Sequence, residues 1–147
     1  MIIAMDDMLW SIDPANDSMA KTIDRIKEFA DALRHRHEVL INLQTDPRVI
    51  ALKPDMKLRH EVMIIYKMAL RMMIEEMKSP HTSINIDYVR GQLQLNIFAH
   101  HSKLPENNNQ VIKMMDDMSV RSKSIDAILE FQSDEKGTTV ILAVKCN

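Results

Sequence analysis

The chain has 147 residues, a mass of 17.0 kDa, a formal net charge of -2 and 46% hydrophobic residues. This size suits one domain and leaves no room for a second full one. A single cysteine, Cys146, excludes a disulfide framework and a cysteine-based zinc site. The near-neutral charge argues against a dedicated nucleic-acid-binding protein, which usually carries a basic excess.

Glycine is scarce, because only Gly91 and Gly137 occur. Loops that cradle phosphates need glycines so that backbone amides can approach the anion and adopt positive φ. A P-loop and a dinucleotide-binding fingerprint are therefore excluded. No apolar stretch is long enough to cross a bilayer, and Met1–Met5 runs directly into acidic residues, unlike a signal peptide.

The first third of the chain predicts a helix end, a linker and a long helix. Residues 1–10 are expected to be the end of a helix that stops near Trp10, and residues 11–17 a turn-rich linker. A helix then runs to about His37, capped by Asp17 or Ser18, because apolar residues recur there at helical spacing.

The middle of the chain predicts a strand, a break and the central helix. Alternating apolar residues at 39–43 indicate a half-buried strand, Pro47 ends it, and residues 49–52 are expected to add a short second strand. A helix from about Met56 to Lys78 follows. Because it is apolar around most of its middle, it should be central and nearly enclosed.

The last part predicts a hairpin, a helix and a second hairpin. The predicted segments are strands at 84–88 and 93–97 around an Arg90-Gly91 turn, a polar stretch at 100–110, a helix at 111–127, and strands at 129–131 and 140–144. Helices kept to one face would give an α/β two-layer sandwich, with a mixed sheet of about five strands and three helices on one side.

Two segments carry a resemblance to a known family. Trp10–Ser18 reads WSIDPANDS, and Met118–Arg121 precedes Lys136–Thr139, which reads KGTT. These are similar to the W-S-I-N-P-x-N-D-S linker and to the M-x-x-R and K-G-T-x motifs of sensor histidine kinases of two-component systems. The chain therefore resembles the ATPase domain of these kinases. The resemblance implies the end of a dimerisation helix and a linker at 1–17, and the ATPase domain at 18–147.

The catalytic boxes of that family are not kept. Met68 replaces a glutamate and Met72 the asparagine that helps to hold Mg²⁺, and a thioether is a poor ligand for this hard cation. Ala99 replaces the aspartate that binds the adenine amino group, and His101 replaces a glycine. Val111–Met115 stands where a glycine-rich box is expected. We therefore predict a degenerate domain with no catalytic residues, no metal ligands and no cofactor, although the family uses Mg-ATP.

Gly137, Thr138 and Thr139 keep the family motif and are the residues expected to retain a vestigial nucleotide contact. They could bind an anion, but a tight hairpin turn explains them equally well.

Methionines are unusually frequent along the central and last helices. The simplest interpretation is that these side chains belong to the hydrophobic core, since Met fills irregular gaps. A second is that these side chains fill the volume where a nucleotide would lie, and a third is an apolar ligand that is not phosphorylated. The residues are Met63, Met68, Met72, Met73, Met77, Met114, Met115 and Met118.

The histidines and paired glutamates are given structural interpretations. His35 and His37 point to different helix faces and are expected at a solvated helix end. The His100-His101 pair could bind a metal or an anion, but a polar loop is favoured because no acidic or cysteine partner is near in sequence. The Glu75-Glu76 pair is expected on a solvated face.

The resemblance implies a cytoplasmic segment of a bacterial sensor, which could be part of a membrane-anchored protein. Its partners would be its own upstream dimerisation helices, a kinase or a response regulator, with no nucleic acid and no direct membrane contact, and a homodimer is one expected arrangement. A non-catalytic signalling or docking module is the first function predicted. The alternatives are an active histidine kinase with unconventional ATP contacts and an unrelated α/β binding protein, which would have helices on both faces of its sheet.

Overall fold

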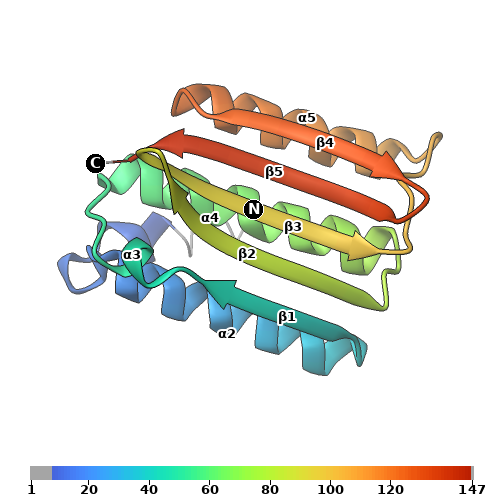
Figure 1. The fold of residues 1–147 in the computed structure, drawn as a ribbon, viewed down its shortest axis with the longest axis horizontal. Helices are drawn as coiled ribbons and strands as arrows, with labels where there is room; N and C mark the ends of the chain where they lie inside the picture. The colour runs from blue at the N-terminus through green and yellow to red at the C-terminus, as the bar shows by residue number, and fades with distance from the viewer. Residues whose placement is uncertain (1–7, 147) are drawn as a thin grey trace.

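A computed structural model describes residues 8–146, in which helices and strands alternate along the chain (Figure 1). Residues 8–12 are helical, and a 3-10 turn follows at Pro14–Asn16. The further helices are α2 (Met19–His37), α3 (Pro47–Ile50), α4 (Met56–Arg71) and α5 (Asn109–Ser124), with a π-helical turn, η2, at Met72–Glu76. The strands are β1 (Leu40–Thr45), β2 (His81–Val89), β3 (Gln92–His100), β4 (Ile128–Asp134) and β5 (Gly137–Lys145).

The strands form one mixed sheet in the order β1-β2-β3-β5-β4. β1 is parallel to β2, and every other neighbouring pair is antiparallel. Both predicted hairpins are confirmed, including the pairing of Leu129 with Leu142 and of Phe131 with Val140. β1 and β4 are the two edge strands.

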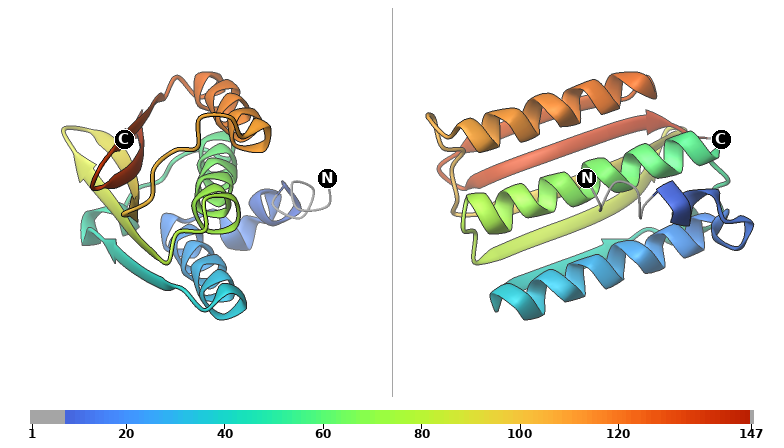
Figure 2. Two further views of the ribbon diagram at one scale, coloured as in Figure 1. Left: turned by 90° about the vertical axis from the view of Figure 1, so that its right-hand side faces the viewer. Right: turned by 180° about the vertical axis from the view of Figure 1, so that it is seen from behind.

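The molecule has two layers, with α2, α4 and α5 side by side on one face of the sheet and the other face open (Figure 2). The predicted two-layer sandwich is therefore confirmed. The third interpretation, an unrelated protein with helices on both faces, is not supported by this arrangement.

Each long helix begins at a side chain that accepts a backbone hydrogen bond, as sequence patterns predict for N-caps. Ser18 accepts from the amide of Lys21 at 3.2 Å, and Asp55 from that of Leu58 at 2.8 Å. Asn108 caps α5 in the same way. α4 lies in the middle of the helix layer and is buried on most of its surface, as its all-round apolar sequence predicts.

Two local predictions are wrong. Residues 49–52 do not form a strand, because Asp46 caps the Arg48 amide at 2.9 Å and Pro47 occupies the first helical position, which starts the short helix α3. The central helix is not α-helical up to Lys78, because its last turn widens into η2, where the Met77 amide bonds the Met72 carbonyl at 2.9 Å. Residues 8–146 therefore form five strands, and the short strand predicted at 49–52 is replaced by α3 and the turn after it.

The core lies between the sheet and the three long helices. All eight methionines singled out from the sequence belong to it, which confirms their core interpretation. Met63, Met72, Met73 and Met118 are fully buried, and Met68, Met77, Met114 and Met115 pack against the core while partly exposed.

Candidate functional site

The residues that the resemblance assigns to the nucleotide boxes lie near the junction of α4 and η2, at the end of β3 and in the first half of α5. Met72 and Ala99 are each 0% exposed, and Met114 packs against the same core. α5 packs directly on both α4 and η2. Apolar side chains therefore occupy this region.

The donor set of this region does not fit a magnesium nucleotide. Mg²⁺ requires oxygen ligands in near-octahedral geometry, whereas Met68 and Met72 offer thioether sulfur. Ala99 offers only a methyl group where an adenine contact would need an acceptor. Among residues 8–146, no group of three or more His, Cys, Asp or Glu side chains could hold a metal ion.

Two threonines flank Ala99 on the neighbouring strands. Thr82 of β2 and Thr138 of β5 are its register partners, and both are fully buried. The Thr138 hydroxyl donates to the Ser102 carbonyl at 2.7 Å and lies 3.0 Å from the Ser133 hydroxyl. The Thr82 hydroxyl has no hydrogen-bond partner among the described residues, so a polar position next to residue 99 is left unsatisfied.

Gly137, Thr138 and Thr139 start β5 but do not converge on one point. The Gly137 amide donates to the Asp134 carboxylate at 3.3 Å, and Thr138 faces the core. Thr139, which pairs with Phe98, lies on the other face of the sheet. Contacts within the hairpin and with the Ser102 carbonyl thus account for the amide and for the Thr138 hydroxyl. A vestigial nucleotide contact by these three residues stays a prediction.

The linker predicted at 11–17 is fixed to the start of α4 by Arg59, a buried guanidinium that sequence reasoning missed. Arg59 donates from Nη1 to the Asp17 carbonyl at 2.9 Å and to the Pro54 carbonyl at 3.0 Å, and from Nη2 to the Ser11 carbonyl at 3.4 Å. The Ser11 hydroxyl also lies 3.4 Å from His60 Nδ1. A charged residue within the apolar surface of α4 was the only sequence sign of this contact.

Glu75 and His37 keep part of their solvent exposure, as expected for a helix end and a solvated face, but their side chains also contact each other. His37 Nε2 lies 3.1 Å from Glu75 Oε2, and both side chains are about one-third exposed. This contact joins the end of α2 to η2, and Arg71 lies one helical turn before Glu75, with Nε 3.9 Å from Oε1. His35 is exposed, as expected.

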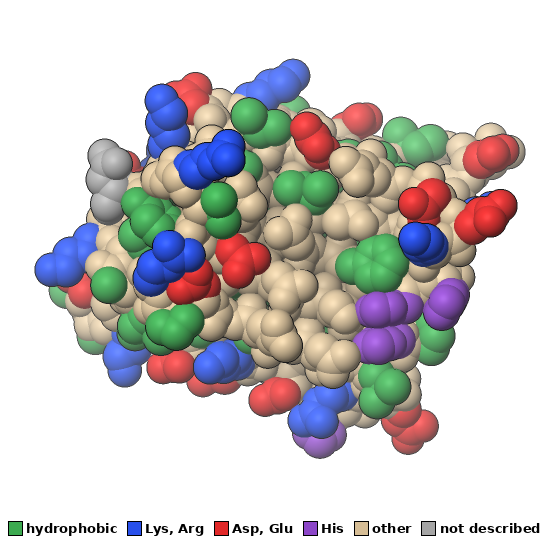
Figure 3. Space-filling model, viewed as in Figure 1, with side chains coloured by type: hydrophobic (Ala, Val, Ile, Leu, Met, Phe, Trp, Pro, Cys, Tyr) green, Lys and Arg blue, Asp and Glu red, His purple; other side chains and the backbone are tan. Residues whose placement is uncertain are grey.

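His101 lies in the turn after β3, within the predicted polar stretch, whereas His100 is still part of the strand. His100 ends β3, and its ring stacks on that of His81 from β2 at 3.9 Å between centroids. Figure 3 shows histidine side chains gathered toward one end of the open face of the sheet. Ser83 Oγ lies 2.7 Å from His100 Nε2. Partial burial, with the neighbouring His81 and His101, lowers the pKa of His100. Sequence distance concealed this cluster, because its partners come from the adjacent strand.

Comparison with known proteins identifies the fold. No protein-family model matches the sequence, and no curated protein matches it. Among solved structures, the Erythrobacter litoralis EL346 blue-light activated histidine kinase superposes with a TM-score of 0.72 at 16% identity, over 98% of this chain and 52% of that one. The Acinetobacter baumannii histidine kinase AdeS gives 0.68 at 7% identity, over 99% and 77%.

The catalytic domain of histidine kinase ThkA superposes with a TM-score of 0.66 at 12% identity, over 85% of this chain and 90% of that domain. The chain has the fold of a histidine kinase catalytic domain. It spans only 61% of the EL346 histidine kinase domain, and identities this low establish the fold alone.

Within the histidine kinase fold, the Met118–Arg121 motif has a clear packing function. Met118 is fully buried, and Val120 is 69% exposed. Arg121 Nη1 lies 3.0 Å from Glu61 Oε2, so the motif fixes α5 to α4. No helix among residues 8–146 has the length and apolarity needed to span a membrane.

Proposed function

We propose that this chain is a degenerate histidine kinase ATPase domain that does not bind Mg-ATP. It acts as a signalling and docking module in the cytoplasmic part of a bacterial two-component sensor. Its partners are dimerisation helices preceding the linker, and a kinase or a response regulator.

The observation that carries the proposal is the chemistry of Met72 and Ala99. Both are fully buried, and neither offers an oxygen to a metal ion or an acceptor to an adenine. A lost hydrogen bond to a charged group costs about 1.5–3 kcal/mol. Together with the missing metal ligands, the deficit exceeds about 4 kcal/mol, which corresponds to a thousandfold or more in affinity.

The contacts that hold the linker and α5 to the central helix α4 support a function in signalling. Arg59 ties the linker to α4, and Arg121 ties α5 to the same helix through Glu61. A change in the position of the linker would therefore be transmitted to the central helix. This coupling needs no nucleotide.

Isothermal titration calorimetry of the chain with Mg-ATP and with a non-hydrolysable analogue tests the proposal. We expect no binding heat for either ligand at millimolar concentration, while an active histidine kinase catalytic domain binds both in the same buffer. Micromolar binding would refute the proposal and favour an active kinase with unconventional ATP contacts.

A second measurement separates binding from catalysis. The chain joined to dimerisation helices that carry a phosphoacceptor histidine should incorporate no phosphate from labelled Mg-ATP. Phosphate on that histidine would establish kinase activity and exclude the degenerate interpretation.

A further inference from the structure

We infer that the free edge of β1 binds an extended segment of a partner protein, which adds a further strand to the sheet. β1 (Leu40–Thr45) forms one border of the sheet, at the end opposite α5 and β4. The inference concerns a different part of the molecule from the nucleotide region and does not depend on nucleotide binding.

The backbone of β1 leaves a regular row of hydrogen-bonding groups unpaired by the sheet. The Leu40 amide bonds the Pro80 carbonyl at 3.0 Å, and the amide of Asp46, just past the strand, bonds the Ile86 carbonyl at 2.9 Å. Even-numbered residues therefore point their backbone groups toward β2. Because successive residues alternate, Ile41, Leu43 and Thr45 direct their N–H and C=O groups away from the sheet.

A groove lies along this edge on the helix side. It has a volume of about 190 Å³ and is lined by Lys27, Ala30 and Asp31 of α2 and by Ile41 and Leu43 of β1. α2 projects beyond β1 in Figure 1 and in the right panel of Figure 2. The helix layer thus extends beyond the sheet at this border, and one more strand paired with β1 would lie over the exposed part of α2.

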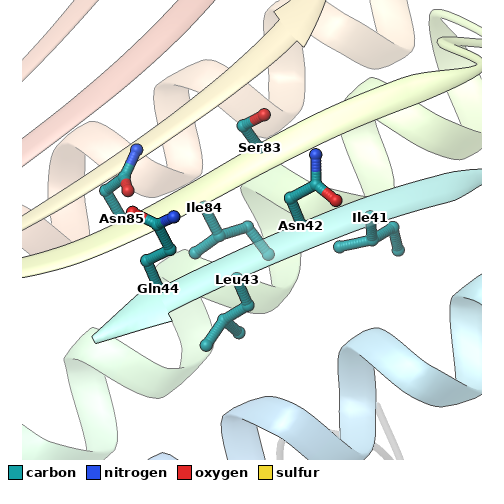
Figure 4. Close-up of a pocket in the computed structure, with 7 residues that line it drawn as sticks. All are labelled: Ile41, Asn42, Leu43, Gln44, Ser83, Ile84 and Asn85. Atoms are coloured by element: carbon teal, nitrogen blue, oxygen red, sulfur yellow. The ribbon is translucent and has the colours of Figure 1, made fainter.

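The opposite side of the same strand is also hollowed. A depression of about 490 Å³ on the open face of the sheet is lined by uncharged side chains of β1 and β2 (Figure 4). Its polar groups are amides and a hydroxyl, from Asn42, Gln44, Ser83 and Asn85. An added strand would therefore meet apolar groups on its helix side and neutral polar groups on its open side.

β1 lacks the features that normally protect an edge strand. Its sequence, LINLQT, contains no charge and no proline, whereas lysines, prolines and inward charges usually prevent edge pairing. The other edge strand, β4, carries Glu130 and Asp134. The contrast marks β1 as the edge suited to pairing.

The shape and charge of the groove favour a peptide over a second copy of the chain. Pairing of β1 with itself would bring two projecting α2 helices together, and helix axes need 8–10 Å of separation. One charge of each sign on the groove complements a segment without net charge, with aliphatic residues alternating with Ser, Thr, Asn or Gln.

The test uses a library of short displayed peptides in which aliphatic and uncharged polar residues alternate. Recovered peptides should bind with micromolar affinity and slow the hydrogen exchange of the Ile41, Leu43 and Thr45 amides, measured by NMR without nucleotide. N-methylation of the peptide residues that pair with β1 should weaken binding about tenfold or more. Methylation of the alternate residues should leave binding unchanged.

The substitution Leu43→Pro removes an outward amide that the sheet does not use, and should abolish binding while the dispersed NMR spectrum of the folded chain remains. The inference fails if no recovered peptide protects β1, or if both methylated sets bind alike. It also fails if the chain self-associates in sedimentation and Leu43→Pro abolishes that association, because the edge would then belong to a second copy. None of these outcomes bears on Mg-ATP binding.

Discussion

The two glycines have positive φ but opposite surroundings. A Cβ at Gly137 (φ +149°) would lie 2.1 Å from the Ala99 carbonyl oxygen and 2.9 Å from the Phe98 ring, whereas one at Gly91 (φ +78°) would meet nothing within 4 Å. Gly137→Ala should lower the free energy of unfolding by more than about 2 kcal/mol, and Gly91→Ala by about 1 kcal/mol, the cost of left-handed backbone alone. Urea denaturation of both variants checks this, and equal losses would contradict it.

The lowered pKa of His100 makes stability depend on pH. Burial and the neighbouring His81 and His101 disfavour its charged form, so the unfolded chain, whose histidines titrate near pH ~6.5, binds the proton more readily. The contribution of His100 is therefore complete above this pH and is lost as the pH falls through it. We expect the free energy of unfolding to drop less between pH ~7.5 and ~5.5 in His100→Gln than in the unsubstituted protein. Urea denaturation at both pH values measures it, and an identical drop would rule out this histidine as the cause.

At the residue scale, the sequence predicted properties that depend on the type of a side chain, but not properties that depend on its contacts with distant residues. Met72 and Ala99 could be assigned to family motifs by their sequence context, and both side chains are fully buried. Arg59 and Glu75 find their partners in segments distant along the chain. No local pattern encodes such partners.

At the element scale, the sequence predicted helices and strands best where caps and periodicity agreed. Ser18 and Asp55 start their helices because each accepts an amide bond one turn ahead. The prediction at residues 49–52 was wrong because a short apolar run has no periodicity that separates a strand from a helix. The Asp46 side chain caps the Arg48 amide and so favours a helix there. The π-helical turn η2 packs against α5, and periodicity reveals neither this contact nor the widened turn.

Arg59 should control how firmly the linker is attached. Arg59→Met keeps an unbranched apolar stem but removes the guanidinium and its bonds to the carbonyls of Ser11, Asp17 and Pro54. Hydrogen exchange at residues 11–17 should become about tenfold faster or more, because local opening then costs less, while amides of β3 and β5 stay protected.

The matched control is Arg34→Met, which removes only an exposed pair with Asp31. Such pairs contribute about 0.2–1 kcal/mol, so linker exchange should not change. Mass spectrometry of both variants after deuterium labelling measures the effect. Slow linker exchange in Arg59→Met would show that other contacts hold this segment.

At the scale of the whole molecule, the two-layer architecture followed from the sequence because amphipathic helices and alternating strands have few ways to bury their apolar faces together. The order of helices and strands along the chain suggested a resemblance to histidine kinases, which the solved structures bear out as a fold. The free edge at β1 was not predicted. A strand lies at the edge because no further strand pairs with it, and the alternation of apolar and polar residues along the strand does not show whether such a neighbour exists.

The methionine core should be essential to the stability of the whole domain. Met72 and Met118 are both 0% exposed, between α4, η2, α5 and the sheet. Met72→Ala and Met118→Ala should each lower the free energy of unfolding by about 2–5 kcal/mol, because a close-packed interior collapses only partly onto a cavity. Val120→Ala, at a 69% exposed position on α5, should change the free energy of unfolding by no more than about 0.5 kcal/mol.

Urea denaturation measures these free energies. Mg-ATP should not raise the melting temperature of either methionine variant, since the new cavity is apolar. A loss below about 1 kcal/mol for Met72→Ala would mean that this space is not tightly packed, and a nucleotide-dependent rise in melting temperature would mean that the site survives beneath the methionine.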